Sequence, residues 1–384
     1  MRFRTSDIMP PPIAELQEAA KKHIGASSFL NLGQGLPGHI PPRPCLDILT
    51  ERIMHPSAHR YTPDPGLVEL REELAIYLRQ NSGLQVDPST ELVVTTGANS
   101  AFAGTILTIM LTGQNIVIPS PHYFNSLMAV NLFGGHVKEV PVNGSFKPEV
   151  ENIEAAIDDR TCAVLLITPN NPTGAVYDRE TIDAVTDICI DRNLWLITDE
   201  TYARMAFDDS IHYSPRSRRD AGKHVITLGS FSKDFGMSGW RVGYVVGPPD
   251  FTKEFLKVQD TITICAPTAG QMLALEVLKS GLLKIDEEIQ KLKLLRDLAY
   301  LRISEIEALE TVRTAGTFYM FPRVKGCTDS RSLVLDILQT AEVLVLPGSV
   351  FGTSGEGFIR LSIGPLTPEA VDEAFDRLKA YFEG

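Results

Sequence analysis

The hydrophobic pattern of the chain changes near residue 91. Before that point, apolar residues recur at helical spacing over residues 13–23 and 67–80. After it, short runs that are apolar on both faces alternate with helical stretches, which is typical of a parallel sheet covered by helices on both sides. The runs cover residues 92–95, 116–119, 163–168, 194–198, 224–228 and 242–246. This alternation predicts an α/β fold.

The two ends of the chain follow different patterns. We expect helices near residues 98–111, 180–191 and 284–309, and an extended arm where prolines gather, from Pro10 to Pro44. Strand-like runs return at residues 317–321, 343–346 and 358–363, with helices between and after them. We therefore expect a large domain over residues 46–285. A smaller α+β domain would combine residues 286–384 with the N-terminal arm, residues 1–45.

Composition and charge narrow the class of protein. The 384 residues are 43% hydrophobic and 22% charged, as in a globular protein that is not embedded in a membrane. A formal net charge of −12 argues against nucleic acid or an anionic membrane as the main partner. The five cysteines are far apart and form no C-x-x-C pair, which favours free thiols and no metal site. With no apolar signal segment near Met1, we expect a cytoplasmic protein.

Small residues open the helix expected after the first run of the sheet. Gly97, Ala98 and Asn99 follow residues 92–95 directly. Free backbone N–H groups at a helix start attract an anion, and a phosphate would fit there. The alternative is an ordinary helix cap without a ligand.

Polar side chains follow two further runs, where ligands bind in open α/β sheets. Asn171 precedes Pro172, which biases its backbone away from the helical region and permits a cis bond. Asp199 and Tyr202 follow the run at residues 194–198. A carboxylate and a phenol placed this way could hold two sides of a heterocycle. The alternatives are a loop turn at Asn171, a helix cap at Asp199 and a buried phenol at Tyr202.

The most informative stretch is GSFSKDFGMSGWRVG, residues 229–243. It places Lys233 just after an apolar run, between serines that include Ser230 and Ser232. Arg241 follows eight residues later. A lysine that forms a Schiff base needs a lowered pKa, which burial and neighbouring positive charge both provide. Together with Asp199, these residues indicate pyridoxal phosphate, a cofactor that needs a lysine, a carboxylate and a phosphate cup.

These motifs resemble the class I/II aminotransferases of the aspartate aminotransferase superfamily, which are fold-type I enzymes dependent on pyridoxal phosphate. The resemblance covers essentially the whole chain. Residues 230–243 match the family's lysine motif, and Asn171-Pro172-Thr173-Gly174 matches its second motif. The family implies a mostly parallel seven-stranded sheet in the large domain and a homodimer whose active sites lie at the interface. It also implies an L-amino acid and a 2-oxo acid as substrates.

The resemblance assigns roles to the residues of the cofactor ring. Lys233 resembles the lysine of the internal aldimine, which later moves a proton between the substrate's Cα and the cofactor's C4′. Asp199 would keep the pyridine nitrogen protonated. Asn171 and Tyr202 would hydrogen-bond the ring O3′, and Tyr123 would stack on the ring.

The phosphate and the substrate have their own residues in this resemblance. The phosphate would be held by Gly97, Ala98, Asn99, Ser230, Ser232 and Arg241, and by Tyr61 of the neighbouring subunit. The guanidinium of Arg360 would grip the α-carboxylate, a task suited to two parallel hydrogen bonds. Gly35 and Asn171 would contact the same substrate. Gly35 also belongs to a G-x-G-x-x-G match at residues 33–38, but the prolines that follow forbid the helix of a dinucleotide site.

Two departures from the family leave the reaction open. Asn99 stands where one dicarboxylate-specific subgroup has a lysine, which favours aromatic, methionine-like or other bulky amino acids, or a broad specificity. His39 stands where the family commonly has an Asp-Phe pair, close to the expected substrate pocket. An N-terminal histidine features in relatives that have become oxidases or hydroxylases of arginine. The alternatives are therefore an oxidase, hydroxylase or lyase on the same scaffold, with His39 as a proton-transfer group or as a loop residue without a role.

Overall fold

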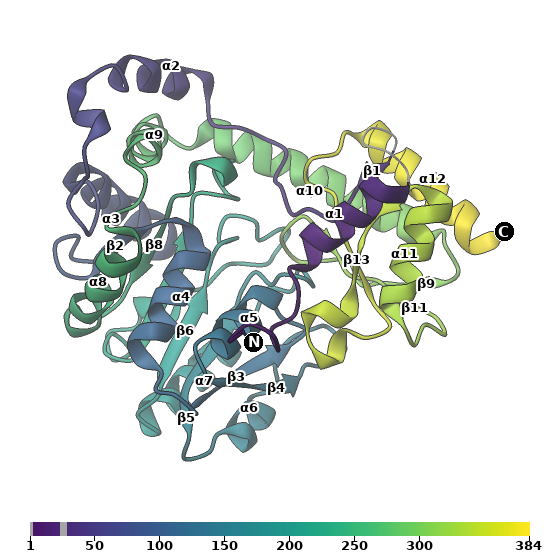
Figure 1. Ribbon diagram of the computed structural model, residues 1–384, viewed down its shortest axis with the longest axis horizontal. Helices are drawn as coiled ribbons and strands as arrows, with labels where there is room; N and C mark the ends of the chain where they lie inside the picture. The colour runs from purple at the N-terminus through teal and green to yellow at the C-terminus, as the bar shows by residue number, and fades with distance from the viewer. Residues whose placement is uncertain (1–2, 24–28) are drawn as a thin grey trace.

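The computed structural model describes residues 3–23 and 29–384. At its centre is a seven-stranded sheet with the strand order β2-β8-β7-β6-β5-β3-β4 (Figure 1). Strand β8 is antiparallel to both of its neighbours, and the remaining pairs are parallel. The bounds are β2 Leu92–Thr95, β3 Asn115–Ser120, β4 His136–Pro141, β5 Thr161–Ile167, β6 Trp195–Asp199, β7 Val225–Ser230 and β8 Gly243–Val246. The predicted α/β fold with a mostly parallel sheet is confirmed.

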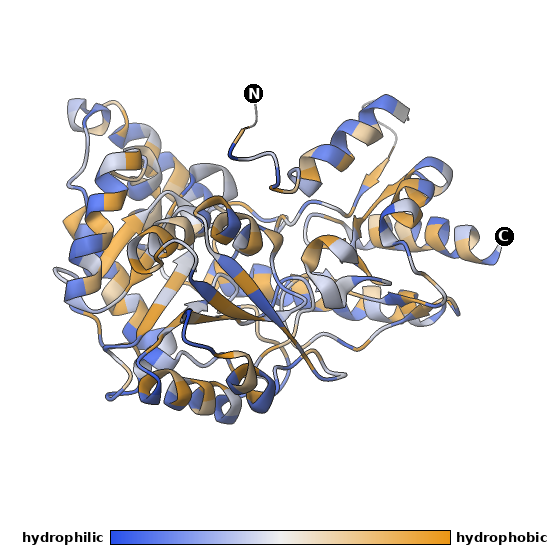
Figure 2. Cartoon of the chain, turned by 60° about the horizontal axis from the view of Figure 1, so that its bottom comes forward, coloured by the Kyte–Doolittle hydropathy of each residue, from blue (hydrophilic) through white to orange (hydrophobic). Residues whose placement is uncertain are grey.

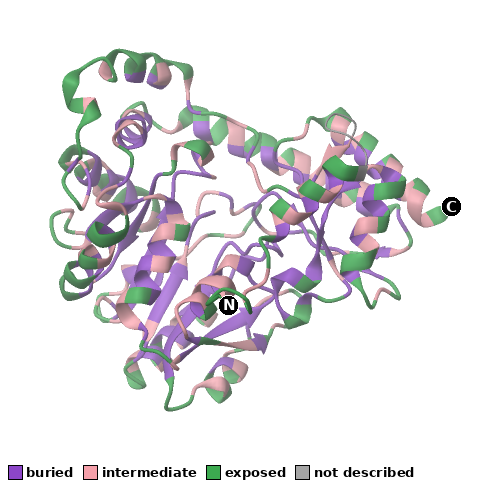
Figure 3. Ribbon diagram, viewed as in Figure 1, coloured by how far each residue is buried: buried purple, intermediate pink, exposed green. Residues whose placement is uncertain are grey.

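Helices cover both faces of this sheet. Along β5, Leu165 and Ile167 pack with α4 and α8, whereas Val164 and Leu166 pack with α6 and α7 on the other face. Because alternate residues of a strand point to opposite faces, both sets must be apolar. The inner strands of the sheet are accordingly mostly apolar in Figure 2 and buried in Figure 3, while the helices turn exposed residues outward. These helices are α4 Gly97–Ile109, α6 Val150–Ala156, α7 Arg179–Asp191 and α8 Pro249–Thr263.

The C-terminal part has its own small sheets and receives a segment from the N-terminus. Strand β1 (Leu30–Asn31) pairs in parallel with β12 (Val343–Leu344), and α1 (Pro12–His23) contacts α11 (Ser330–Ala341). Helix α10 (Leu283–Ser304) runs between this part and the large sheet (Figure 1). A three-stranded sheet has the order β10-β14-β13. Its bounds, with the last helix, are β10 Tyr319–Met320, β13 Leu346–Pro347, β14 Ile359–Ser362 and α12 Pro368–Glu383. The exact domain boundaries stay a prediction.

The pattern of the sequence missed one strand of the large sheet, as well as the two-residue strands β1, β9 (Leu309–Glu310) and β11 (Arg323–Val324), and overextended one helix. Strand β4 lies at the edge of the sheet and contains the polar residues His136, Lys138 and Glu139, so it lacks the continuous apolar run of a central strand. The helix expected to reach residue 309 ends at Ser304. Leu309 instead begins strand β9, which pairs with β11.

Several helices were not anticipated. The expected extended arm is wrong for residues 43–52, which form α2 (Arg43–Arg52) with Pro44 in the first turn, where its missing N–H costs no hydrogen bond. Helix α9 (Thr268–Lys279) is buried on most sides, so it shows no clear polar face. Helix α5 (Phe124–Leu132) was not anticipated either, whereas the helix predicted over residues 67–80 is present as α3 (Val68–Ser82). No helix in the described ranges has the length and apolar character needed to cross a membrane.

Candidate active site

Residues from distant parts of the chain line one cavity of about 400 Å³ at the carboxyl ends of the parallel strands. Most of the residues expected at the site lie here: Gly35, Ala98, Asn99, Tyr123, Asn171, Asp199, Tyr202, Ser230, Ser232, Lys233, Arg241 and Arg360. Lining residues that the sequence did not single out are Ile13, Gln34, Leu36, Ile167, Thr201, Ser238 and Tyr319. The fold therefore converts a set of separate motifs into a single concave site.

Lys233 lies in the loop after β7. Its Nζ donates a hydrogen bond to the carbonyl oxygen of Gly35. Burial lowers the pKa of Lys233 to about 8, and the charges of Arg360 and Arg241 add to the effect. A lysine with this pKa is partly neutral near physiological pH, so its amine is available to react with a carbonyl.

Backbone and cationic groups meet at the start of α4. Thr96 precedes the helix and forms no side-chain capping bond, so the first N–H groups remain available to an anion. Gly97 has φ +78°, and a Cβ there would lie 2.6 Å from Nη2 of Arg241. Only glycine allows Arg241 to come this close to the helix start. The arrangement fits a phosphate group, with Ser230 at the end of β7 on the same cavity.

Asp199 is the carboxylate among the residues that line the cavity. Its Oδ1 accepts a hydrogen bond from the backbone N of Thr201 at 3.0 Å. Burial raises the pKa of Asp199, and the neighbouring charge of Glu200 acts in the same direction, against the bonds from Thr201. A half-buried carboxyl group in this state gains from a cationic partner, which a protonated pyridine nitrogen would provide.

Three tyrosines surround the same space. The hydroxyl groups of Tyr202 and Tyr319 lie 2.8 Å apart, and both rings are buried. The hydroxyl of Tyr123 accepts a hydrogen bond from Asn125 at 2.9 Å, and burial raises the pKa of Tyr123 to about 12. Tyr319 lay inside a predicted strand, but nothing in its sequence neighbourhood marked it as a site residue. Its only signal was an aromatic side chain in an apolar run.

Arg360 is a buried cation with 1% exposure. Its Nη1 donates to Oδ1 of Asn171 at 3.0 Å, and its Nη2 donates to the carbonyl oxygen of Gly33 at 2.6 Å. The rings of Tyr319 and Phe351 flank the guanidinium at 4.5 Å and 5.0 Å. Within the described residues, no carboxylate forms an ion pair with Arg360. A buried charge without a counter-ion is costly, so this position fits the carboxylate of a ligand.

Two expected site residues lie elsewhere in this chain. Tyr61 is 77% exposed and lines a separate hollow beside His59 and Arg60. His39 does not line the cavity. Its Nε2 lies 3.2 Å from the carbonyl oxygen of Asp234, and its ring borders a different hollow next to α10. Burial lowers the pKa of His39, which favours its neutral form. The geometry therefore gives no support to His39 as a substrate contact.

The residue that follows Lys233 is a buried carboxyl group. Asp234 is 3% exposed, and its Oδ2 accepts a hydrogen bond from the backbone N of Arg204 at 3.2 Å. Burial raises the pKa of Asp234 to about 7, although the charge of Arg204 and its hydrogen bond oppose this rise. Sequence reasoning missed Asp234 because a charged residue next to a loop lysine gives no sign of burial.

Comparison with known proteins identifies the family. The family model for aminotransferase class I and II matches residues 27–378. The chain is 30% identical to aromatic-amino-acid aminotransferase 2 of Thermococcus litoralis, over 98% of this chain and 96% of that protein. It is 32% identical to an aspartate aminotransferase of Pyrococcus abyssi, over 99% and 97% of the two chains. The crystal structure of an aromatic aminotransferase from Pyrococcus horikoshii superimposes with a TM-score of 0.89 at 32% identity, covering 97% of this chain and 98% of that one.

The chain belongs to the class I and II aminotransferases. It is a transferase that moves amino groups and uses pyridoxal phosphate. The residues of the cavity fit that cofactor, because they include a lysine of lowered pKa, a half-buried carboxyl group and a helix start beside an arginine. The family resemblance read from the sequence is confirmed. An aromatic and an aspartate aminotransferase are 30% and 32% identical to the chain, so similarity alone does not select the amino acid.

Proposed function

We propose that this aminotransferase transfers the amino group of an L-amino acid with a bulky apolar side chain to a 2-oxo acid. The observation that carries the proposal is the distribution of charge in the cavity. Among the described residues that line it, the cations are Lys233, Arg241 and Arg360, and each has a role at the cofactor or the α-carboxylate. No lining cation of this chain is left over for a second carboxylate on the substrate.

The uncharged residues that line the rest of the cavity support the same substrate class. Ile13, Gln34 and Leu36 contribute uncharged side chains from the N-terminal segment to the cavity. An aromatic or methionine-like side chain would lose water-exposed apolar area against Ile13 and Leu36, which favours its binding. The similarity to an aromatic-amino-acid aminotransferase agrees with this choice.

In this proposal the chain's own residues move the proton and hold the substrate. When bound, pyridoxal phosphate supplies an electron sink that stabilises negative charge at the substrate's Cα. Lys233 would remove the proton from that Cα, as its pKa of about 8 makes the neutral amine accessible. Arg360 would hold the α-carboxylate, with Asn171 and Gly35 beside it. Together they would fix the Cα next to Nζ of Lys233.

Further residues would hold the cofactor itself. Asp199 would pair with the pyridine nitrogen, and Tyr202 with Asn171 would donate to the ring oxygen. Tyr123 would stack on the ring face. The phosphate would be held by Gly97, Ala98, Asn99, Ser230, Ser232 and Arg241. Asn171, Tyr202 and Ser230 are buried, which would strengthen the hydrogen bonds that they form to the cofactor.

The proposal includes a homodimer in the cytoplasm. The exposed ring of Tyr61 and nearby exposed apolar side chains, among them Met54 and Ile262, support an interface at this face. Tyr61 would then reach the phosphate of the neighbouring subunit's site. The five cysteines are free thiols, which supports a reducing compartment.

The test is a comparison of kcat/KM for phenylalanine, methionine, leucine and aspartate with one common 2-oxo acid. We expect phenylalanine or methionine to exceed aspartate by roughly 100-fold or more, as a carboxylate left without a partner is rejected strongly. The variant Ile13→Lys adds a cation to the cavity wall. It should lower the ratio of kcat/KM for phenylalanine to kcat/KM for aspartate. A preference for aspartate in the unaltered enzyme would refute the proposed substrate class and leave the aminotransferase assignment intact.

A further inference from the structure

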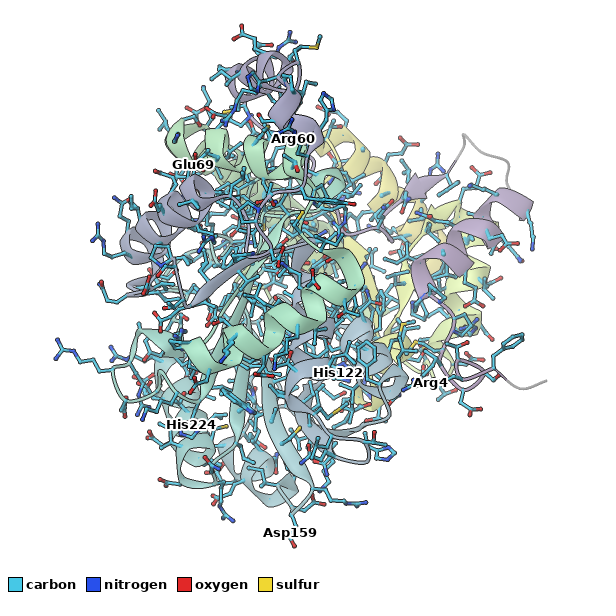
Figure 4. The ribbon with its side chains drawn as sticks, turned by 60° about the vertical axis from the view of Figure 1, so that its left-hand side comes forward. Arg4, Arg60, Glu69, His122, Asp159 and His224 are labelled. Atoms are coloured by element: carbon cyan, nitrogen blue, oxygen red, sulfur yellow. The ribbon has the colours of Figure 1, made fainter. Side chains whose placement is uncertain are left out.

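A buried histidine and a half-buried glutamate lie between the edge of the large sheet and a C-terminal loop. His122 follows β3, is labelled in Figure 4, and its side chain is fully buried. Glu139 lies on the edge strand β4 with 16% of its side chain exposed. Nε2 of His122 is 3.7 Å from Oε1 of Glu139. In the part of the chain that the structure describes, neither residue forms another ion pair, and neither lines the cavity.

The imidazole of His122 lies between two oxygen atoms. Nδ1 lies 3.2 Å from the carbonyl oxygen of Tyr123, while Nε2 faces the carboxylate of Glu139. Burial acts to raise the pKa of Glu139, but the nearby imidazole of His122 and the hydrogen bonds from Thr353 outweigh it and lower that pKa to about 2. Glu139 is therefore a carboxylate that binds Thr353 beside the buried imidazole of His122.

These two residues form hydrogen bonds to the loop of residues 351–353. Oε2 of Glu139 accepts hydrogen bonds from the backbone N and from Oγ1 of Thr353, at 2.6 Å and 2.7 Å. The backbone N of His122 donates to the carbonyl oxygen of Phe351 at 2.8 Å. Gly352 has φ +108°, and a Cβ there would lie 2.7 Å from Oε2 of Glu139. Glycine is thus required for the loop to come this close to the sheet.

The loop of residues 351–353 packs against the guanidinium of Arg360. The ring of Phe351 lies 5.0 Å from the guanidinium carbon of Arg360 and 5.6 Å from the ring of Phe124. Phe351 and Arg360 are both buried, so a shift of the loop would move the surface on which the guanidinium rests. Two parallel hydrogen bonds to a carboxylate demand a guanidinium held within about 0.5 Å of its productive position.

We propose that His122 and Glu139 are positioning residues that hold Arg360, through Phe351, in the place where it binds the substrate's α-carboxylate. The inference rests on the proposed role of Arg360 and extends it to two residues outside the cavity. Loosening the pair would weaken carboxylate binding. It would leave Lys233 and its proton transfer in place, because the lysine loop is held by other contacts.

The variant Glu139→Gln tests this inference, since it removes the charge with almost no change in shape. The probe is 3-phenylpropionate, a carboxylate without an amino group, whose Kd for the holoenzyme is measured by calorimetry. We expect the Kd and the KM for the amino donor to rise about tenfold, with kcat within about twofold and an unchanged visible spectrum. Thr353→Val loses one hydrogen bond to Glu139 and should weaken binding of 3-phenylpropionate less than Glu139→Gln does. Thr353→Ser keeps the hydroxyl group and should bind 3-phenylpropionate as the unaltered enzyme does.

A matched control uses Asp158, the ion-pair partner of the residue that precedes Glu139 on the same strand. Lys138 pairs with Asp158 at 2.7 Å, away from the C-terminal loop, so Asp158→Asn removes a similar charge without touching Phe351. Its Kd should equal that of the unaltered enzyme. The inference is overturned if Glu139→Gln binds 3-phenylpropionate normally, if Asp158→Asn weakens binding equally, or if kcat falls as far as affinity does. Arg360→Lys separates the two proposals: if this change also leaves the Kd unaltered, the role of Arg360 itself is wrong.

Discussion

The guanidinium carbon of Arg360 lies 4.5 Å from the centre of the Tyr319 ring. The same tyrosine places its hydroxyl 2.8 Å from that of Tyr202, and a Cβ on Gly35 would collide with it. One side chain from the C-terminal part therefore contacts residues proposed for the substrate and for the cofactor. The site depends on this packing of both parts of the chain.

Two substitutions at Tyr319 should distinguish the contribution of its ring from that of its hydroxyl group. Tyr319→Phe keeps the ring beneath Arg360 and should leave the KM for the amino donor within about twofold. Tyr319→Leu loses the cation–π contact, worth about 1–2 kcal/mol in a desolvated site, and should raise KM roughly 5- to 30-fold. Steady-state kinetics with one donor check both values. Equal KM values for the two variants would show that the ring does not support Arg360.

The lowered pKa of Lys233 has a direct consequence for the apoenzyme. The rate at which the apoenzyme captures pyridoxal phosphate should rise with pH through a midpoint near 8, because the neutral amine reacts and burial lowers the pKa from 10.5. Arg360→Gln removes a neighbouring positive charge and should move the midpoint upward, though not to 10.5, since burial persists. Stopped-flow absorbance at a series of pH values measures the rate. A midpoint near 10.5 in the unaltered protein would contradict the burial of Lys233.

Asp199→Asn should separate cofactor binding from catalysis. The amide preserves the shape and the bond from Thr201, so the protein should still bind pyridoxal phosphate. Without a negative charge at the pyridine nitrogen, the rate of the amino-transfer half-reaction should fall roughly 100-fold or more. Rapid-mixing spectroscopy gives this rate. A change below about threefold would mean that Asp199 only fixes the turn at Thr201.

Asp234 should make the free energy of unfolding depend on pH. Its pKa is raised from 3.8 to about 7, so the folded state holds a proton that the unfolded state releases. The stability that this carboxyl group contributes is complete below pH 3.8 and is lost as pH rises through about 7. Asp234→Asn cannot lose that proton, and it should gain a few kcal/mol relative to the unaltered protein between pH 5 and pH 8. Urea unfolding at the two pH values measures the difference, with the exposed Asp209→Asn as a control that should show no such gain.

The proposed interface can be tested with hybrid dimers. Lys233→Ala and Tyr61→Phe would each impair the enzyme, the first within its own site and the second in the partner's. Mixed and refolded together, they form hybrids in which one site has both Lys233 and Tyr61 intact. We expect activity to recover toward one quarter of normal, as half of the dimers are hybrids with one complete site each. Recovery no greater than the sum of the separate variants would contradict the shared site.

Much of the site could be predicted because its residues follow apolar runs. Asp199 is the last residue of a strand, Asn171 and Lys233 follow the ends of two others, and the carboxyl ends of parallel strands meet at one edge of the sheet. Their positions at the ends of predicted strands were therefore enough to predict that these three residues lie close together. Arg360 came from the resemblance to the family, since its own strand carries no local sign of a ligand.

The remaining features depend on contacts between distant segments. Ile13 and Tyr319 line the same cavity although about 300 residues separate them, and no periodicity encodes that meeting. Strand β4 was missed because an edge strand does not need an apolar run. His39 was expected near the substrate from its place in the sequence, yet its segment turns the ring toward Asp234.

The most direct measurement mixes the holoenzyme with single L-amino acids in the absence of any 2-oxo acid, while the absorption spectrum and dissolved oxygen are followed together. An aminotransferase with the proposed site should form one 2-oxo acid per active site with no oxygen uptake, fastest with phenylalanine, tyrosine or methionine, and Lys233→Ala should form none. Continued oxygen consumption, or an undiminished reaction in Lys233→Ala, would contradict amino transfer through Lys233.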